Sequence, residues 1–326
     1  MEEHVSYWRG KRVTVTGGAG LLGCHLVQAL REHGCDDPFV VRSRDYDLTQ
    51  EDGAIRLLET TRPDIVFHLA GSVGGIRANR ERPAGFFYDN LTMGTFMLHH
   101  AQRLGVRRFV AAGPGCGYPE GAPLPLREES LWDGPPQAET APYALAKRLL
   151  QIQARAYYEQ YGFVSIIAIP GNLYGPHDKS DPAEATVIAS LVAKFLRAVE
   201  AREESVQVWG SGDATRDFIY AGDAALGMLA AAEGYDRTEV VNLSSGAETS
   251  IRELAAMLTE VTGFRGRVTW EADQPEGQQR RWFDITKARR DLGFAPRVSL
   301  REGLERTVEW YRSQRAAPVT PGEPRR

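Results

Sequence analysis

Short apolar runs alternate with amphipathic helical segments through the first half of the chain. Residues 11–15 predict a strand, and Leu22, Leu26 and Leu30 recur at helical spacing directly after it. Further strands are predicted at 39–41, 64–71, 108–112 and 163–170, and further helices at 51–62, 86–104 and 142–160. A strand–helix alternation of this regularity predicts an α/β fold with a doubly wound parallel sheet, the Rossmann arrangement.

The rhythm changes after Tyr174, where longer helices are separated by short strands and turns. Helices are predicted at 186–201, 249–263 and 300–314, with short strands within 206–219 and at 268–270. We therefore expect a dinucleotide-binding domain at 10–171, to which the chain returns around 217–245. Residues 172–216 and 246–313 are expected to form a smaller substrate domain. The Pro-rich, charged residues 314–326 are expected to be a disordered tail.

A glycine loop, TGGAGLLG, joins the first strand to the first helix. Gly17 allows a tight turn, Gly20 lets the backbone approach a phosphate, and Gly23 lets the helix pack closely on the strand. The first N–H groups of the helix, at Leu21 and Leu22, then face the anion. This context favours a dinucleotide site over a plain tight turn.

The ends of the next two strands indicate which dinucleotide binds and where it lies. Arg42 and Arg44 follow the second strand with no acidic residue before Asp45, which favours the 2′-phosphate of NADP(H) over NAD, although a solvated basic pair is the alternative. The third strand ends in Leu69, Ala70 and Gly71, which are expected to lie beneath the cofactor, and residues 71–78 are expected to form a flexible loop.

Composition excludes several classes of function. The 326 residues are 42% hydrophobic and carry a net charge of −4, so no basic field for nucleic acid is present. Three cysteines without CxxC spacing are typical of a reduced, cytoplasmic protein. Neither a membrane-spanning run nor an HExxH motif occurs, so we expect no membrane span and no metal site.

Tyr143 and Lys147 stand four residues apart in a predicted helix and therefore share one face. A lysine beside a phenol is expected to lower the pKa of the phenol, so that the tyrosine exchanges a proton with a substrate oxygen. The alternative is a solvent-exposed pair without a catalytic role. The glycine loop earlier in the chain favours the catalytic interpretation.

The glycine loop, the HLAG strand end and YALAK together resemble the extended short-chain dehydrogenase/reductases, within the NAD-dependent epimerase/dehydratase family. Three longer stretches, HLAGSVGGIRANRERPAGFFYDN, NLYGPHD and VWGSGDATRDFI, are similar to the GDP-L-fucose synthase group within it. This group converts a GDP-4-keto-6-deoxy sugar by 3,5-epimerisation and NADPH-dependent 4-reduction. The resemblance covers roughly residues 11–311.

The resemblance implies roles residue by residue. Gly17, Gly20, Gly23 and Arg44 match cofactor-binding positions, Tyr143 and Lys147 match the catalytic pair, and Cys116 matches the acid/base cysteine of the group, with an inert buried thiol as the alternative. Pro170, Asn172 and Leu173 complete the implied cofactor contacts. The implied substrate contacts are Asn172, Lys194, Trp209, Arg216 and Arg281.

Two positions depart from the pattern of the resembled group. Pro114 stands where the group has a catalytic serine, so a hydroxyl donor to the C4 oxygen is missing and Ser72 or a substrate hydroxyl is the candidate replacement. Thr186 stands where the group has a second acid/base residue, a histidine. Losing one oxyanion donor costs about 10²–10³ in rate.

We therefore expect an NADP-dependent nucleotide-sugar epimerase/reductase that acts on a 4-keto sugar, with a GDP-sugar favoured, as a homodimer. Two alternatives remain: a non-reducing epimerase, and a catalytically silent NADP(H)-binding regulator. Turnover of NADPH with a 4-keto sugar nucleotide separates the three.

Overall fold

The computed structural model describes residues 7–179, 185–271 and 278–316. Its largest element is a sheet of six parallel strands in the order β10-β5-β4-β3-β1-β2, which confirms the predicted doubly wound sheet. The strands are β1 (Val13–Thr16), β2 (Phe39–Val40), β3 (Ile65–His68), β4 (Arg108–Ala112), β5 (Ser165–Pro170) and β10 (Val241–Leu243).

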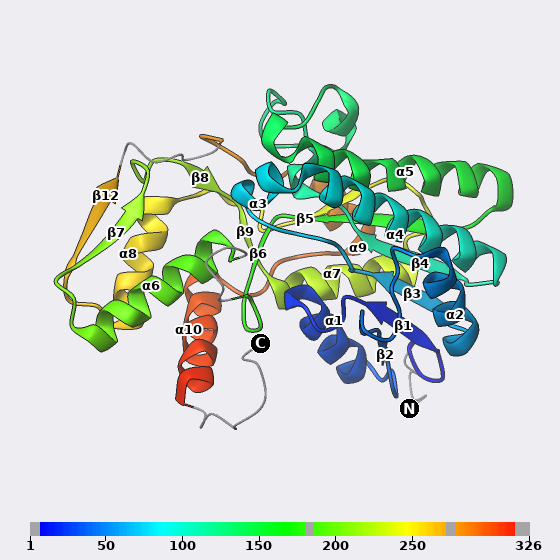
Figure 1. The fold of residues 1–326 in the computed structure, drawn as a ribbon, viewed down its shortest axis with the longest axis horizontal. Coiled ribbons are helices and arrows are strands. Elements are labelled where there is room, and N and C mark those ends of the chain that lie inside the picture. The colour runs from blue at the N-terminus through cyan, green and yellow to red at the C-terminus, as the bar shows by residue number, and fades with distance from the viewer. Residues whose placement is uncertain (1–6, 180–184, 272–277, 317–326) are drawn as a thin grey trace.

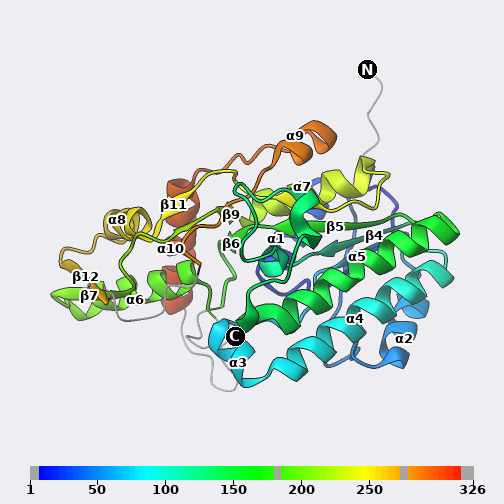
Figure 2. The same ribbon diagram turned by 90° about the horizontal axis from the view of Figure 1, so that it is seen from above.

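Helices cover both faces of this sheet, as Figures 1 and 2 show. The helices near it are α1 (Leu21–Glu32), α2 (Glu51–Thr61), α4 (Pro83–Arg103), α5 (Ala141–Tyr161), α7 (Ala221–Gly234) and α9 (Thr286–Leu292). Alternate strand residues enter different cores: Ile65 and Phe67 pack with α1 and α7, and Val66 packs with α2, α4 and α5. Both faces of each strand are therefore buried, as in parallel sheets generally.

The smaller half is assembled from paired short strands and three helices (Figure 1). Its strand pairs are β6 (Asn172–Tyr174) with β9 (Phe218–Tyr220), β7 (Ser205–Trp209) with β12 (Arg267–Glu271), and β8 (Thr215–Arg216) with β11 (Thr249–Ser250). Helices α6 (Val187–Ala201), α8 (Ile251–Thr262) and α10 (Leu300–Ala316) share a core of their own with these strands.

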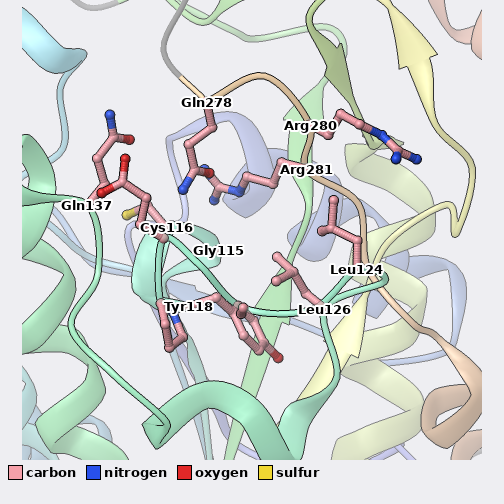
Figure 3. A pocket seen from close by; sticks show the side chains of 12 residues that line it. Gly115, Cys116, Tyr118, Leu124, Leu126, Gln137, Gln278, Arg280 and Arg281 are labelled. Carbon is pink, nitrogen blue, oxygen red and sulfur yellow. The ribbon is translucent and has the colours of Figure 1, made fainter.

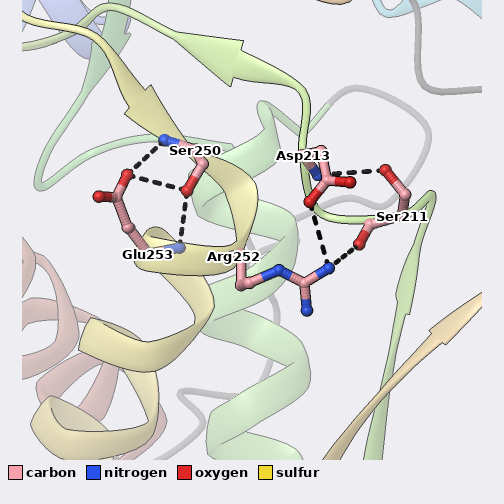
Figure 4. Close-up of polar contacts among 5 residues, drawn as sticks. All are labelled: Ser211, Asp213, Ser250, Arg252 and Glu253. Atoms are coloured by element: carbon pink, nitrogen blue, oxygen red, sulfur yellow. Dashed lines mark hydrogen bonds and ion pairs between the residues drawn. The ribbon is translucent and has the colours of Figure 1, made fainter.

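Several boundaries differ from the sequence-based expectation. The loop expected at 71–78 gives way to a short helix, α3 (Ile76–Glu81), before α4 begins at Pro83. Residues 314–316, expected in the tail, continue α10, and the rest of the predicted tail lies outside the described residues. The start of α8 carries a capping box: the Ser250 hydroxyl and the Glu253 carboxylate satisfy each other's backbone N–H groups (Figure 4).

The Asp217 carboxylate holds the junction between the two halves. It is fully buried and accepts hydrogen bonds from the backbone N–H groups of Ser245, Gly246 and Phe283 at 3.0, 3.1 and 3.2 Å. These donors come from the segment after β10 and from the segment that leads into α9. One carboxylate therefore joins its own segment to two others beside the cleft described next.

Candidate active site

The glycine loop between β1 and α1 is pressed against the end of β3. Gly17 has a φ of +68°, and a Cβ there would lie 2.7 Å from the Ala70 nitrogen; a Cβ on Gly23 would lie 2.2 Å from the Gly17 oxygen. The Thr16 hydroxyl accepts a hydrogen bond from the Ala70 N–H at 3.2 Å. Only glycine fits at 17 and 23, and the loop leaves the first N–H groups of α1 without helical carbonyl partners, which is the arrangement that binds a phosphate.

A cleft of about 2290 Å³ opens along the carboxyl ends of the strands and is closed from the other side by the smaller half. Single ligands usually occupy about 300–1,000 Å³, so this cleft has room for a dinucleotide and a second ligand together. Its lining includes these predicted cofactor residues: Gly17, Gly20, Leu21, Leu22, Gly23, Arg42, Leu69, Ala70, Gly71, Tyr143, Lys147, Pro170, Asn172 and Leu173.

The two arginines after β2 take different positions. Arg42 lines the cleft, whereas the Arg44 side chain is 83% exposed and its Nε lies 3.7 Å from an Asp45 carboxylate oxygen. Arg44 is not part of the cleft lining. In this conformation Arg42, and not Arg44, is the residue placed to contact a 2′-phosphate.

Tyr143 and Lys147 enter the cleft from the first two turns of α5. Lys147 is buried, and its Nζ donates to the Ala70 carbonyl oxygen at 3.5 Å. Burial lowers the pKa of Lys147 to about 8, because a desolvated ammonium is less stable, while the nearby Cys116 sulfur opposes the shift. The two side chains thus share one helix face and one cleft, as their spacing predicts.

The expected effect of Lys147 on the phenol is not found. Burial is the main cause that raises the pKa of Tyr143, and the negative charge of a Cys116 thiolate raises it further. Desolvation therefore outweighs any help from the described cations, and the tyrosine is held as a neutral phenol. A neutral phenol is the form that donates a proton.

Cys116 lies in a short 3-10 helix, Gly115–Gly117, that follows β4. Burial raises the pKa of its thiol, while Arg281, the Thr140 hydroxyl and Lys147 act in the opposite direction. A Cβ on Gly115 would lie 2.8 Å from the Pro170 oxygen and 3.2 Å from an Arg281 nitrogen, so the loop passes tightly between β5 and Arg281. Cys116 is thereby held in the lining of the cleft.

Pro114 and Thr186, the two positions that depart from the resembled pattern, make structural contacts. Pro114 precedes the 3-10 helix, and its carbonyl accepts a hydrogen bond from the Gly117 N–H at 2.9 Å. The Thr186 hydroxyl accepts from the Ala189 N–H at the start of α6 and donates to the Asp178 carboxylate at 2.7 Å. Ser72, the candidate replacement donor, does line the cleft.

The predicted substrate residues divide into two groups. Arg216 and Arg281 line the cleft together with Asn172, whose side-chain amide donates to the Asp217 carbonyl at 3.0 Å. Lys194 and Trp209 lie outside the lining: the Lys194 Nζ donates to the Gln207 carbonyl at 3.2 Å and sits 5.5 Å from the Trp209 ring centre. The outward face of α6 carries Lys194 toward β7 and away from the cleft.

Comparison with known proteins agrees with this geometry. The model of the NAD dependent epimerase/dehydratase family matches residues 13–244. The chain belongs to this family. GDP-L-fucose synthase 1 of Arabidopsis thaliana is 35% identical over 303 residues, which cover 93% of this chain and 94% of that protein.

Solved structures of epimerase/dehydratase relatives superpose over almost the whole chain. A GDP-L-fucose synthetase from Naegleria fowleri bound to NADP is 28% identical, with a TM-score of 0.89 and coverage of 97% of this chain and 96% of that chain. A GDP-mannoheptose C4 reductase from Campylobacter jejuni with NADP bound is 26% identical, with a TM-score of 0.84 and coverage of 93% and 98%.

This epimerase/dehydratase chain also has polar groups in the cleft or just behind its lining that the sequence patterns do not single out. Thr140 lines the cleft on the Cys116 side, three residues before Tyr143. The Asn90 amide donates to the Ser72 carbonyl at 2.9 Å, and its oxygen has no hydrogen-bond partner among the described residues. That oxygen lies 3.0 Å from where a Gly71 Cβ would stand, beside Lys147. In the sequence, the hydroxyl residue three positions before the tyrosine of YxxxK is the feature that indicates Thr140.

Among the described residues, no three His, Cys, Asp or Glu side chains gather as metal ligands would. No helix in that part of the chain has the length and apolar character needed to cross a bilayer.

Proposed function

We propose that this chain is an NADP-dependent epimerase/reductase that acts on a 4-keto GDP-sugar. The observation that carries the proposal is the shared cleft: Tyr143, Lys147 and Cys116 line the same cavity as the glycine loop and Arg42. The family relatives named above as GDP-L-fucose synthases and a GDP-heptose reductase support the substrate class.

The glycine loop and the strand ends fit a bound NADPH. Gly17 and Gly23 allow the tight loop, Gly20 leaves its outer side open, the N–H groups at the start of α1 would hold a pyrophosphate, and Arg42 carries the positive charge for a 2′-phosphate. A bound NADPH would supply the hydride that reduces the sugar C4.

The proposal gives each catalytic side chain one proton to hold or move. As C4 gains a hydride, the Tyr143 phenol donates its proton to the C4 oxygen, so that the ketone becomes a secondary alcohol. The Lys147 ammonium stabilises the resulting phenolate. A ketone at C4 acidifies the protons on C3 and C5, and Cys116 exchanges one of these as thiolate and thiol without any net oxidation.

The second candidate, a non-reducing epimerase, depends on the same oxygen. Pro114 offers neither a hydroxyl nor an N–H to the C4 oxygen. Negative charge develops on that oxygen both when C4 receives a hydride and when removal of a C3 or C5 proton forms the enolate, so either reaction needs a donor from another group. Thr140 and Ser72, which line the cleft, are the candidate donors.

Incubation with NADPH and a panel of 4-keto GDP-sugars in deuterated water tests both candidates. The proposed function predicts NADPH oxidation together with deuterium at C3 or C5 of the product, measured by NMR. Deuterium uptake without NADPH oxidation means a non-reducing epimerase. NADPH binding with neither reaction on any sugar of the panel means a silent NADP(H)-binding regulator.

We also infer a homodimer formed through α4 and α5. These helices pack against each other, and they leave large apolar side chains exposed on one side of the large sheet: Tyr88, Leu149, Ile152 and Tyr161. Light scattering after gel filtration, with Ile152→Glu as the disrupting variant, tests this assembly. A monomer for the unmodified protein contradicts it.

A further inference from the structure

A second, smaller pocket opens beside the cleft and is called the side pocket here. Gly115, Cys116 and Arg281 line both cavities, so they form the mouth between them. Figure 3 shows Cys116 and Gln137 on one side of the side pocket and Gln278 with Arg281 on the other. Leu124 and Leu126 form an apolar wall.

The side pocket has room for a few atoms, and its lining has both apolar and polar parts. Its volume is about 50 Å³, and a water-sized group needs about 10–15 Å³, so about three to five non-hydrogen atoms fit. The two leucines suit carbon atoms. The amides of Gln137 and Gln278 and the guanidinium of Arg281 suit hydroxyl groups.

Two of these polar groups are available to a ligand. Among the described residues, the Gln278 amide has no hydrogen-bond partner, and Arg281 forms no ion pair with a carboxylate. Burial lowers the pKa of Arg281, because desolvation destabilises the charged guanidinium, while Cys116 and Tyr118 act in the opposite direction. A ligand hydroxyl that accepts a hydrogen bond from the guanidinium offsets part of this desolvation.

The position of Cys116 decides which part of a sugar enters. Under the proposed function, Cys116 exchanges the proton of a carbon next to C4, and the substituent of that carbon extends past Cys116 into the side pocket. C3 carries only a hydroxyl, which leaves most of the pocket unfilled. C5 carries the carbon branch of the sugar, so the carbon served by Cys116 is C5.

We propose that the side pocket receives a two-carbon, dihydroxylated arm on C5, and that a 4-keto heptose nucleotide is therefore a better substrate than a 6-deoxyhexose nucleotide. The C6–C7 arm of a heptose has four non-hydrogen atoms, whereas the C6 methyl of a 6-deoxyhexose has one. In the exchange step the Cys116 thiolate takes the C5 proton, the electron pair moves into the C4 enolate, and the thiol returns a proton to C5. This inference rests on the proposed function for the assignment of Cys116.

Binding of unreactive sugar nucleotides tests the side pocket independently of turnover. We expect GDP-mannoheptose to bind about tenfold more tightly than GDP-6-deoxymannose in calorimetric titrations with NADP⁺ present. Gln278→Leu keeps the size of the side chain and removes the amide, so it should abolish this preference and leave GDP-6-deoxymannose binding unchanged. Gln279→Leu, at the neighbouring position outside the pocket, is the matched control and should keep the preference.

The outcomes separate the two proposals. Equal binding of both nucleotides, or a Gln278→Leu variant that weakens both alike, overturns the side pocket as an arm site, even when 4-keto sugars are turned over. A heptose preference lost only in Gln278→Leu supports the side pocket, even when no 4-keto sugar is turned over and the proposed function fails. Deuterium at C3 and not at C5 of a 4-keto heptose overturns the assignment of Cys116 to C5.

Discussion

Two parts of the active site differ in how they hold their side chains. Tyr143 and Lys147 stand on α5, a helix of 21 residues, where the backbone fixes their relation. Cys116 and Pro114 stand on a loop that is held by contacts from outside, through Pro170 and Arg281. The helix presents a phenol and an ammonium to the cleft, whereas the loop presents a thiol next to a proline-containing turn.

Burial acts on both parts in the same direction. It raises the pKa of Tyr143 and of Cys116 and lowers that of Lys147, so each group is shifted toward its uncharged form. Under the proposed function this suits Tyr143, because a phenol must be protonated to donate to the C4 oxygen. It works against exchange at Cys116, because the thiolate is the form that accepts a carbon-bound proton. The proposed proton donor for reduction is therefore better prepared than the proposed base for exchange.

The largest effect is expected for Tyr143→Phe, which tests the helical part of the site. We expect NADPH oxidation by a 4-keto GDP-sugar to fall about 10³-fold, because the ring packing stays while the proton donor is lost, and NADPH binding to persist. Tyr157→Phe on the same helix, where the hydroxyl contacts His99, is the matched control. Turnover near that of the unmodified protein in Tyr143→Phe means that another group is the acid.

Cys116→Ser tests whether the thiol on the loop exchanges a proton of the sugar. A serine hydroxyl is a far weaker acid than a thiol, so deuterium uptake into the sugar should slow about 10²-fold while hydride transfer from NADPH changes much less. NMR of the product in deuterated water measures the uptake. Cys35→Ala, which removes a buried thiol away from the cleft, is the control, and uptake that is the same in both variants assigns the exchange to another residue.

Arg42→Ala and Arg44→Ala form a matched pair on the cofactor side. The unmodified protein should bind NADPH at least about tenfold more tightly than NADH, or about 1.4 kcal/mol. Because Arg42 lines the cleft and Arg44 contacts Asp45, Arg42→Ala should remove most of this preference and Arg44→Ala little of it. Fluorescence titration measures both, and the opposite order means that Arg44 turns inward when the nucleotide binds.

Pro114→Ser restores a hydroxyl to the loop. If C4 reduction is limited by the missing donor, single-turnover NADPH oxidation should become up to about tenfold faster, or about 1.4 kcal/mol of barrier. Pro135→Ser is the control for the loss of a proline. Pro135 lies in an exposed loop, where its carbonyl accepts a hydrogen bond from the Glu120 N–H. A well-folded Pro114→Ser variant that is no faster shows that Thr140, Ser72 or the substrate already supplies the donor, or that reduction is not the native step.

The smallest effect is a difference in pH dependence between the two half-reactions. Lys147 has a pKa of about 8, so its ammonium is present below this pH and is lost above it. Reduction should therefore fall about fourfold between about pH 7 and about pH 8.5. Exchange should rise over the same range. The pKa of Cys116 is raised, so its thiol is still protonated at the lower pH and forms more thiolate as the pH increases. Parallel profiles for both reactions contradict the separate roles.

The sequence predicts the helical part of the site better than the loop part, for a physical reason. A YxxxK spacing on a helix places both side chains on one face whatever surrounds them, and glycines at 17 and 23 are required by steric contacts that the strand–loop–helix pattern implies. The strands of the large sheet follow from their apolar runs, because both of their faces are buried.

Spacing does not decide which way a side chain turns in a loop or on an exposed helix face. Arg42 and Arg44 are equivalent in the sequence, and only the turn after β2 brings Arg42 into the cleft. Lys194 follows the outward face of α6 to Trp209 and leaves the cleft lining. The pKa of Tyr143 depends on desolvation by residues far apart in the chain, which no local pattern contains.

The last described helix, α10, closes the cleft opposite the glycine loop: Trp310 and Tyr311 line it, and the Trp310 ring centre lies 5.2 Å from that of His177. During synthesis the glycine loop emerges long before α7 and α10. The loop leads into α1, which packs on α7, and the cleft is closed by α10, so both parts need segments that are made late. A nascent chain of this protein therefore completes neither its dinucleotide surface nor its enclosed cleft until most of the chain has been made.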